Sequence, residues 1–138
     1  MIVLDTNVVS EIIARTPSQK VLEWLRLQRR DTIYTTAITE AEILTGVAVM
    51  PQGKRRAELE VATGTLFESH FASRILPFDS EAARIYPRLV AARKRLGRPV
   101  TALDAQIGAI CAANGAALAT RNVRDFEGCG LQLINPWF

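Results

Sequence analysis

Short apolar runs alternate with longer amphipathic stretches along the whole chain. Runs rich in β-branched or aliphatic residues predict buried strands over residues 2–4, 33–35, 74–77, 117–120 and 131–134. Apolar residues at helical spacing predict helices over residues 7–13, 21–28, 37–49, 53–71, 80–96 and 102–114. Because the strands alternate with helices and show no alternating polar face, the pattern indicates an α/β sandwich with a parallel sheet of about five strands.

Two of the predicted helices contain residues that disfavour a helix. Gly64 interrupts the stretch 53–71, and Pro87 lies inside the stretch 80–96. Proline lacks the backbone N–H that a helix needs, so we expect a kink or a break at Pro87. Gly97 follows the end of the same stretch, where a glycine commonly terminates a helix.

The composition predicts one folded domain over residues 1–138. Hydrophobic residues make up 49% of the 138 residues and charged residues 22%, which excludes disorder as the main state. The chain holds neither an apolar stretch long enough for a membrane span nor a basic start typical of a signal peptide, so we expect a cytoplasmic protein. His70 is the only histidine, which argues against a histidine-rich zinc site and a Ser-His-Asp triad.

The net charge of +3 is unevenly distributed. Residues 51–99 carry ten basic and five acidic side chains, whereas each flanking segment has one more acidic than basic residue. A basic segment of this kind suits an anionic partner, although a GC-rich genome would also enrich arginine. The basic residues that could contact a nucleic acid are Arg93, Lys94, Arg95 and Arg98; a solvated helix end is the alternative.

Acidic residues stand where an α/β fold places its sites. Asp5 directly follows the first predicted strand, and sites in open parallel sheets form beyond the carboxyl ends of strands. The same carboxylate could instead cap the helix that begins near Asn7, and the residue alone favours neither interpretation. The loop after the strand 117–120 offers Asn122 and Asp125, for which a polar surface turn is the alternative.

Two further carboxylates lie at the margins of apolar helix faces. The inward side of helix 37–49 is expected to be formed by Ile38, Ala41, Leu44, Thr45, Ala48 and Val49. Glu42 falls at the edge of that side, and Asp104 has a similar position beside Leu103 and Ile107 in helix 102–114. A carboxylate at the edge of a buried face needs a cation, a metal or hydrogen-bond donors. The alternatives are a solvent-exposed Glu42 and a capping box from Thr101 to Asp104.

Oxygen ligands from separate elements, without a histidine cluster, favour a hard cation such as Mg²⁺ or Mn²⁺. Such cations support phosphoryl transfer, because they acidify a bound water and neutralise charge on phosphate oxygens. The residues therefore suggest chemistry on a phosphate ester, with the basic segment 54–98 along a nucleic-acid backbone.

Several segments together resemble a PIN-domain ribonuclease, and more narrowly the VapC and FitB toxins of type II toxin–antitoxin pairs. These segments are Leu4–Asn7, Glu42, Gly97–Pro99 leading to Asp104, Ala119–Asn122 through Asp125–Phe126, and Asn135–Trp137. The likeness covers essentially the whole chain, in order and at matching separations.

The resemblance implies a PIN-like three-layer sandwich and a Mg²⁺- or Mn²⁺-dependent endoribonuclease that hydrolyses RNA with metal-activated water. It implies metal binding by Asp5, Glu42 and Asp104, and places Asn122 at the family's fourth acidic position. The supporting positions are Thr6, Asn7 and Asp125. It further implies a homodimer and a cognate antitoxin protein.

Two other functions compete with this one. A phosphatase of the haloacid-dehalogenase type also begins with an Asp after a strand, but it needs a second Asp where this chain has Asn7 and a later lysine, and no lysine follows Lys94. A catalytically silent PIN-fold regulator, binding a nucleic acid or a protein, would keep the same fold without the reaction.

Overall fold

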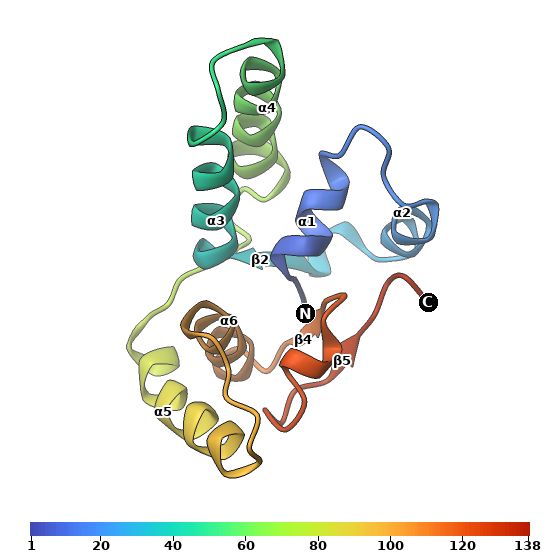
Figure 1. The fold of residues 1–138 in the computed structure, drawn as a ribbon. Coiled ribbons are helices and arrows are strands. Elements are labelled where there is room, and N and C mark those ends of the chain that lie inside the picture. The colour runs from blue at the N-terminus through green and yellow to red at the C-terminus, as the bar shows by residue number, and fades with distance from the viewer.

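The computed structural model describes residues 1–138 and shows helices on both faces of one sheet (Figure 1). The strand order is β3-β2-β1-β4-β5, and every neighbouring pair is parallel. The strands are β1 (Ile2–Leu4), β2 (Ile33–Thr36), β3 (Ile75–Leu76), β4 (Ala117–Ala119) and β5 (Leu133–Ile134). The predicted parallel sheet of an α/β sandwich is confirmed, although its edge strands are shorter than the apolar runs suggest.

Six α-helices surround the sheet. They are α1 (Thr6–Ile12), α2 (Gln19–Arg26), α3 (Ala37–Ala48), α4 (Lys54–Thr65), α5 (Ser80–Arg95) and α6 (Ala102–Ala113). The predicted interruption at Gly64 is wrong, because α4 passes through it and continues into a π-helical turn, η2 (Leu66–His70). The predicted break at Pro87 is also wrong. Pro87 lies within a continuous α5, where it occupies an exposed position.

The alternation of side chains along β1 and β4 divides the core between the two faces. Val3 and Leu118 pack with Ile107 and Cys111 of α6. Leu4 and Ala119 point to the other face, where they join a larger cluster with α1, α2 and η2. Helix α5 packs on α6 through a further small cluster, and Gly108 allows the close approach because a Cβ there would lie 2.9 Å from Leu89 Cδ1. Cys111 is buried and both cysteines are free.

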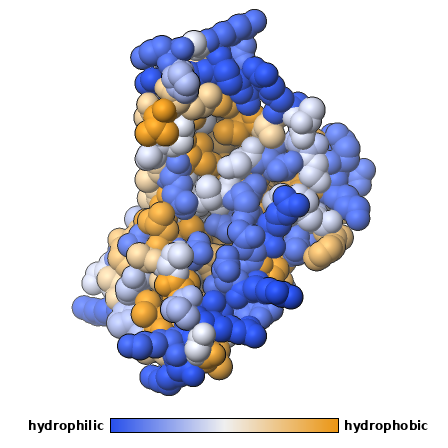
Figure 2. Space-filling view, in the orientation of Figure 1, coloured by the Kyte–Doolittle hydropathy of each residue, from blue (hydrophilic) through white to orange (hydrophobic).

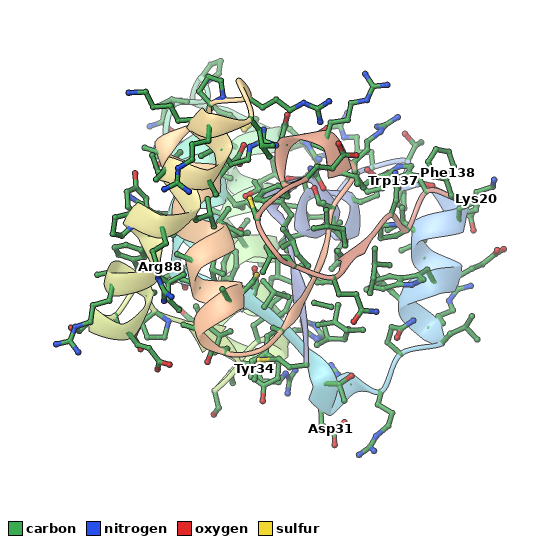
Figure 3. All side chains as sticks on the ribbon, turned by 90° about the horizontal axis from the view of Figure 1, so that it is seen from below. Lys20, Asp31, Tyr34, Arg88, Trp137 and Phe138 are labelled. Carbon is green, nitrogen blue, oxygen red and sulfur yellow. The ribbon has the colours of Figure 1, made fainter.

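The C-terminal residues return to the α2 side of the molecule. Figure 3 shows Trp137 and Phe138 beside Lys20 of α2, whereas Arg88 of α5 lies on the opposite side. Trp137 packs against the cluster that contains Val21, and Phe138 is exposed. Within this fold, no helix combines the length and the apolar character that crossing a membrane requires.

The order of the strands defines where a site can form. The chain builds β1, β2 and β3 outward in one direction and then returns to place β4 on the other side of β1. In open α/β sheets, ligands bind in the crevice beyond the carboxyl ends of the strands at such a reversal. The residues that follow β1 and β4 therefore stand where a ligand is expected to bind.

Candidate active site at the carboxyl ends of β1 and β4

Asp5 lies at the reversal point and is almost completely buried, with 4% of its surface exposed. Because Leu4 pairs with Ala119 in the parallel ladder, the next residues, Asp5 and Thr120, emerge side by side. The Thr120 hydroxyl donates to Asp5 Oδ2 at 2.7 Å, and Asn7 Nδ2 donates to the same oxygen at 3.3 Å. Asp5 Oδ1 accepts from the backbone N–H of Thr6 at 2.8 Å.

The capping role considered for Asp5 is therefore real, since its carboxylate accepts a hydrogen bond at the start of α1. A cap needs only one oxygen, and here the second oxygen is held by two side chains. Capping and a site role thus coexist in one carboxylate.

Glu42 joins this group through Thr6. The Thr6 hydroxyl donates to Glu42 Oε1 at 2.9 Å and lies 3.1 Å from the Thr39 hydroxyl oxygen. Helix α3 follows β2 directly, with Thr36 accepting from the N–H of Thr39 as the N-terminal cap. Its first turns therefore project from the same edge of the sheet as Asp5.

The predicted inward side of α3 is wrong. The buried residues are Thr39, Ile43 and Val47, whereas Leu44 and Val49 are 43% and 77% exposed. Thr39 can be buried because its hydroxyl lies within hydrogen-bond distance of the Thr6 hydroxyl. Glu42 is half-buried beside this true inner face, so its expected marginal position still holds.

Asp104 approaches from the opposite face of the sheet. It lies in the first turn of α6, where its N–H donates to the hydroxyl of Thr101 at 3.3 Å, as the capping box predicted. Its side chain is half-buried and lines a cavity of about 80 Å³ together with Asp125 and Arg93. The capping bond uses the backbone N–H of Asp104 and not its carboxylate.

The loop after β4 adds polar groups at the same edge. The N–H of Asn122 donates to the Thr120 hydroxyl at 3.1 Å, and the N–H of Arg121 donates to Asn7 Oδ1 at 3.2 Å. These bonds fix the loop that carries Asn122 and Asp125. Figure 2 shows hydrophilic side chains over the middle of the face where α1, α3 and α6 converge.

The carboxylates at this edge form no ion pair. None of the protein's ion pairs includes Asp5, Glu42 or Asp104. Burial raises the pKa of Asp5, and the negative charge of Glu42 adds to the rise. Burial also raises the pKa of Asp104, with contributions from Asp5 and Asp125, while Arg93 acts in the opposite direction.

The donor chemistry fits a divalent cation. Carboxylate oxygens with uncompensated charge, steadied by hydroxyl and amide donors, are the ligands that Mg²⁺ and Mn²⁺ prefer. No group of three or more His, Cys, Asp or Glu side chains is gathered tightly enough to enclose a metal ion in this structure. The fit therefore rests on donor type and charge at the edge of the sheet.

Sequence reasoning missed Thr120 as a site residue. Its position directly after β4, equivalent to that of Asp5 after β1, was a signal that could have identified it. The expected surface position of Arg93 is also wrong. Only 4% of Arg93 is exposed, because its Nη1 donates to the backbone carbonyls of Arg124 and Glu127.

Lys94, Arg95 and Arg98 are exposed, as expected for the end of a helix. Arg98 forms an ion pair with Glu127, with Nη1 2.9 Å from Oε2. Contact of these residues with RNA stays a prediction.

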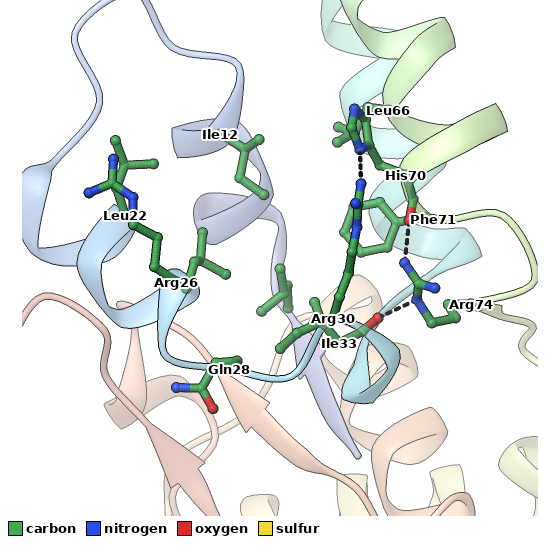
Figure 4. A pocket seen from close by; sticks show the side chains of 12 residues that line it. Ile12, Leu22, Arg26, Gln28, Arg30, Ile33, Leu66, His70, Phe71 and Arg74 are labelled. Atoms are coloured by element: carbon green, nitrogen blue, oxygen red, sulfur yellow. Dashed lines mark hydrogen bonds between the residues drawn. The ribbon is translucent and has the colours of Figure 1, made fainter.

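A second cavity lies away from these carboxylates, on the α1 and α2 face (Figure 4). It has a volume of about 390 Å³ and an apolar floor that includes Leu4 and Phe71. Its rim is basic: Arg30 Nη2 lies 2.8 Å from His70 Nδ1, and Arg74 donates to the carbonyl oxygens of His70 and Ile33.

A family model described as the PIN domain matches residues 2–128. The chain belongs to the PIN-domain family. This PIN domain is 43% identical over 137 residues to the VapC ribonuclease Y4jK of Sinorhizobium fredii, a match that spans 99% of the chain and 98% of the relative. It is 36% identical to toxin FitB of Neisseria gonorrhoeae over 99% of both chains.

Solved structures show the same likeness. The structure of FitAB bound to an IR36 DNA fragment matches with a TM-score of 0.90 and 35% identity, covering 100% of this chain and 96% of that one. The crystal structure of FitAcB from Neisseria gonorrhoeae matches with a TM-score of 0.89, 36% identity and 99% coverage of both chains. The resemblance to VapC and FitB toxins is thereby confirmed, and so is the PIN-like sandwich.

Proposed function

We propose that this PIN domain is the toxin of a type II toxin–antitoxin pair and cuts RNA as a Mg²⁺- or Mn²⁺-dependent endoribonuclease. The observation that carries the proposal is the group of carboxylates at the reversal point of the sheet. Asp5, Glu42 and Asp104 bring negative charge from three separate elements to one edge, and no cationic side chain pairs with them.

Asp5 and Asp104 would be the direct metal ligands, with Glu42 as a third ligand or as the group that orients water. When bound, the cation would supply Lewis acidity, which acidifies a water molecule and neutralises charge developing on the phosphoryl oxygens. Asn122 can offer an amide oxygen but adds no charge, so it is the weaker candidate.

The protein's own residues prepare the site for an in-line attack on an RNA phosphodiester. Thr120 and Asn7 hold Asp5 Oδ2, so this carboxylate keeps one orientation. Thr6 holds Glu42 Oε1, which leaves Oε2 to orient the attacking water and accept its proton. The exposed amide of Asn122 can donate to the leaving 3′-oxygen.

An antitoxin and a second copy of the chain are the proposed protein partners. Support for the antitoxin comes from related structures, because a similar chain from Mycobacterium tuberculosis belongs to the VapBC family of toxin–antitoxin systems, and VapBC from Salmonella typhimurium was solved bound to DNA. That structure matches with a TM-score of 0.80 and 26% identity.

Cleavage of RNA by the purified chain tests the activity. We expect Mg²⁺ or Mn²⁺ to support cleavage, EDTA to stop it, and Asp104→Asn to remove it. Asp31→Asn is the matched control, since Asp31 is an exposed carboxylate paired with Arg29. Attack by water must leave 5′-phosphate and 3′-hydroxyl ends. Metal-independent cleavage, 2′,3′-cyclic phosphate ends or full activity of Asp104→Asn would overturn the proposal.

A further inference from the structure

An arginine-lined cavity adjoins the acidic edge, which is the edge of the sheet that carries Asp5, Glu42 and Asp104. It has a volume of about 660 Å³ and lies between the end of α5 and the loop after β4. Its wall is formed by Arg93, Arg98, Pro99, Arg124 and Glu127. Arg93 and Pro99 also line the smaller cavity of about 80 Å³ that reaches Asp104 and Asp125. We call the larger space the arginine cavity.

The end of α5 fixes two of these arginines relative to each other. Gly97 adopts a left-handed conformation with φ of 69°, and the N–H of Arg98 donates to the carbonyl of Arg93 at 3.0 Å. This pairing is the Schellman ending of a helix, in which glycine tolerates the positive φ. Arg98 therefore leaves the helix at a set angle toward the loop after β4.

Arg93 is the fixed part of the cavity wall. Its Nη1 donates to the carbonyls of Arg124 and Glu127 at 3.1 and 2.6 Å, which ties the loop to α5. Its Nε has no hydrogen-bond partner although the atom is buried. Arg93 also belongs to none of the ion pairs, so its buried positive charge would attract an anion in the cavity.

Arg98 and Arg124 are the exposed parts of the wall. Arg98 pairs with Glu127, but the two side chains are 59% and 47% exposed, and such surface pairs contribute little to stability. Arg124 belongs to none of the ion pairs. An incoming anion can therefore displace Glu127 from Arg98 and meet an uncompensated Arg124.

Phosphate is the anion that suits this arrangement. Arginine presents a planar fork that matches phosphate oxygens, and three guanidinium groups surround one space. A free anion would be repelled by the neighbouring carboxylates of Asp104 and Asp125. An anion attached to a strand that already occupies the acidic edge would instead be held beside it.

We propose that the arginine cavity binds an RNA backbone phosphate adjacent to the one that is cleaved, and that Glu127 competes with this phosphate for Arg98. This inference rests on the proposed ribonuclease function. It adds the direction in which the RNA strand leaves the acidic edge, toward the end of α5.

Binding of single-stranded RNA with a non-hydrolysable linkage at the cleaved position, to the full chain in Mg²⁺, tests the cavity without cleavage. Arg98→Ala and Arg124→Ala should each weaken binding of a six-nucleotide RNA roughly tenfold, as expected for a hydrogen bond between charged groups. Each should also lower the salt dependence of binding by about 0.7, the value for one single-strand phosphate. Glu127→Gln should strengthen binding roughly threefold, because it frees Arg98.

The matched controls are Arg29→Ala and Asp31→Asn, which break an exposed Arg–Asp pair of 2.8 Å elsewhere on the surface. These variants should bind RNA within about twofold of the wild type, since exposed surface substitutions have small effects. If Arg98→Ala and Arg124→Ala bind RNA as tightly as Arg29→Ala, the proposal is wrong.

Neutral methylphosphonate linkages identify the bound phosphate. Placing one next to the cleaved linkage should remove the difference between the wild type and Arg98→Ala, whereas the same change at distant linkages should preserve it. If excess inorganic phosphate occupies the arginine cavity, and no methylphosphonate linkage changes the effect of Arg98→Ala on RNA binding, the ligand is free phosphate. The RNA proposal then fails.

The cleavage assay separates this inference from the function on which it rests. If the chain cleaves RNA with metal but Arg98→Ala does not change its RNA affinity, only the proposal for the arginine cavity is refuted. If binding depends on Arg98 at one linkage but the chain never cleaves RNA, the proposed ribonuclease function is refuted. The proposed phosphate binding by the arginine cavity is then retained.

Discussion

The cavity on the α1 and α2 face and the acidic edge of this PIN domain differ in whether their charged side chains have partners. The cavity between α1, α2 and η2 is roomy, with an apolar floor and a rim on which Arg30 and Arg74 already have hydrogen-bond acceptors. The acidic edge is narrow. Its carboxylates accept hydrogen bonds from hydroxyl, amide and backbone donors but form no ion pair.

The comparison teaches that volume is a poor guide to chemistry. An apolar cavity whose rim arginines already have hydrogen-bond acceptors does not need a ligand. Buried negative charge without a counter-ion instead favours the binding of a cation. The following substitutions test this difference, beginning with those expected to have the largest effects.

Loss of a single carboxylate at the acidic edge should have the largest effect. Asp5→Asn should lower RNA cleavage by more than about 100-fold, because even the partners of metal ligands are worth 10- to 100-fold. Single-turnover cleavage rates at several Mg²⁺ concentrations provide the measurement. Activity near the wild-type level would place the chemistry elsewhere.

Removal of the buried hydroxyl that holds Asp5 should have the next largest effect. Thr120→Val deletes a hydrogen bond of 2.7 Å that keeps the pKa of Asp5 from rising further with burial. We expect a loss of roughly 10- to 100-fold in activity or metal affinity and a rising limb of the pH profile shifted to higher pH.

Thr35→Val is the matched control for Thr120→Val. Thr35 is a fully buried threonine of β2, and its hydroxyl donates to the carbonyl of Leu4 at 3.0 Å. Its loss should cost about 1 kcal/mol of stability, from the lost buried hydrogen bond, without moving the pH profile. An equal shift in both variants would mean that Thr120 acts only through folding.

Stability without metal should depend on pH with a defined sign. The pKa of Asp104 is raised above 3.8, so as pH rises through the unfolded value the folded state retains more protons and the free energy of unfolding falls. At neutral pH without metal, Asp104→Asn should raise the melting temperature by a few degrees, since about 1 kcal/mol corresponds to roughly 2–4 °C.

Thermal melts across pH, with and without Mg²⁺, measure this effect. Mg²⁺ should stabilise the wild type increasingly as pH rises and should stabilise Asp104→Asn much less. If metal-free Asp104→Asn melts below the wild type at neutral pH, the Asp104 carboxylate is not destabilising, and the contrast between the cavity and the acidic edge is weakened.

Substitutions in the cavity between α1, α2 and η2 should have the smallest effect on the reaction. Arg30→Ala and His70→Ala remove exposed side chains of its rim and should leave RNA cleavage within about twofold of the wild type. The same cleavage assay applies. A loss comparable to that of Asp5→Asn would show that both the cavity and the acidic edge serve the reaction.

The sequence predicted the sheet well because its strands are buried on both faces and read as plain apolar runs. It also singled out Asp5 and Asp104 as candidate site residues, from a position after a strand and from a position at the margin of an apolar helix face. It could not reveal that Thr120 reaches Asp5, because that contact depends on the register between β1 and β4. Arg93 was misjudged because its acceptors, the carbonyls of Arg124 and Glu127, are distant in the chain.

The hydrogen bond between Thr120 and Asp5 joins residues 115 positions apart in the chain. During synthesis, Asp5 leaves the ribosome long before β4 exists, so a nascent chain has its first carboxylate but neither the hydroxyl that holds it nor the strand beside it. Contacts of such long range form late in folding. The proposed ribonuclease site therefore cannot form in a nascent chain until β4 has left the ribosome and paired with β1.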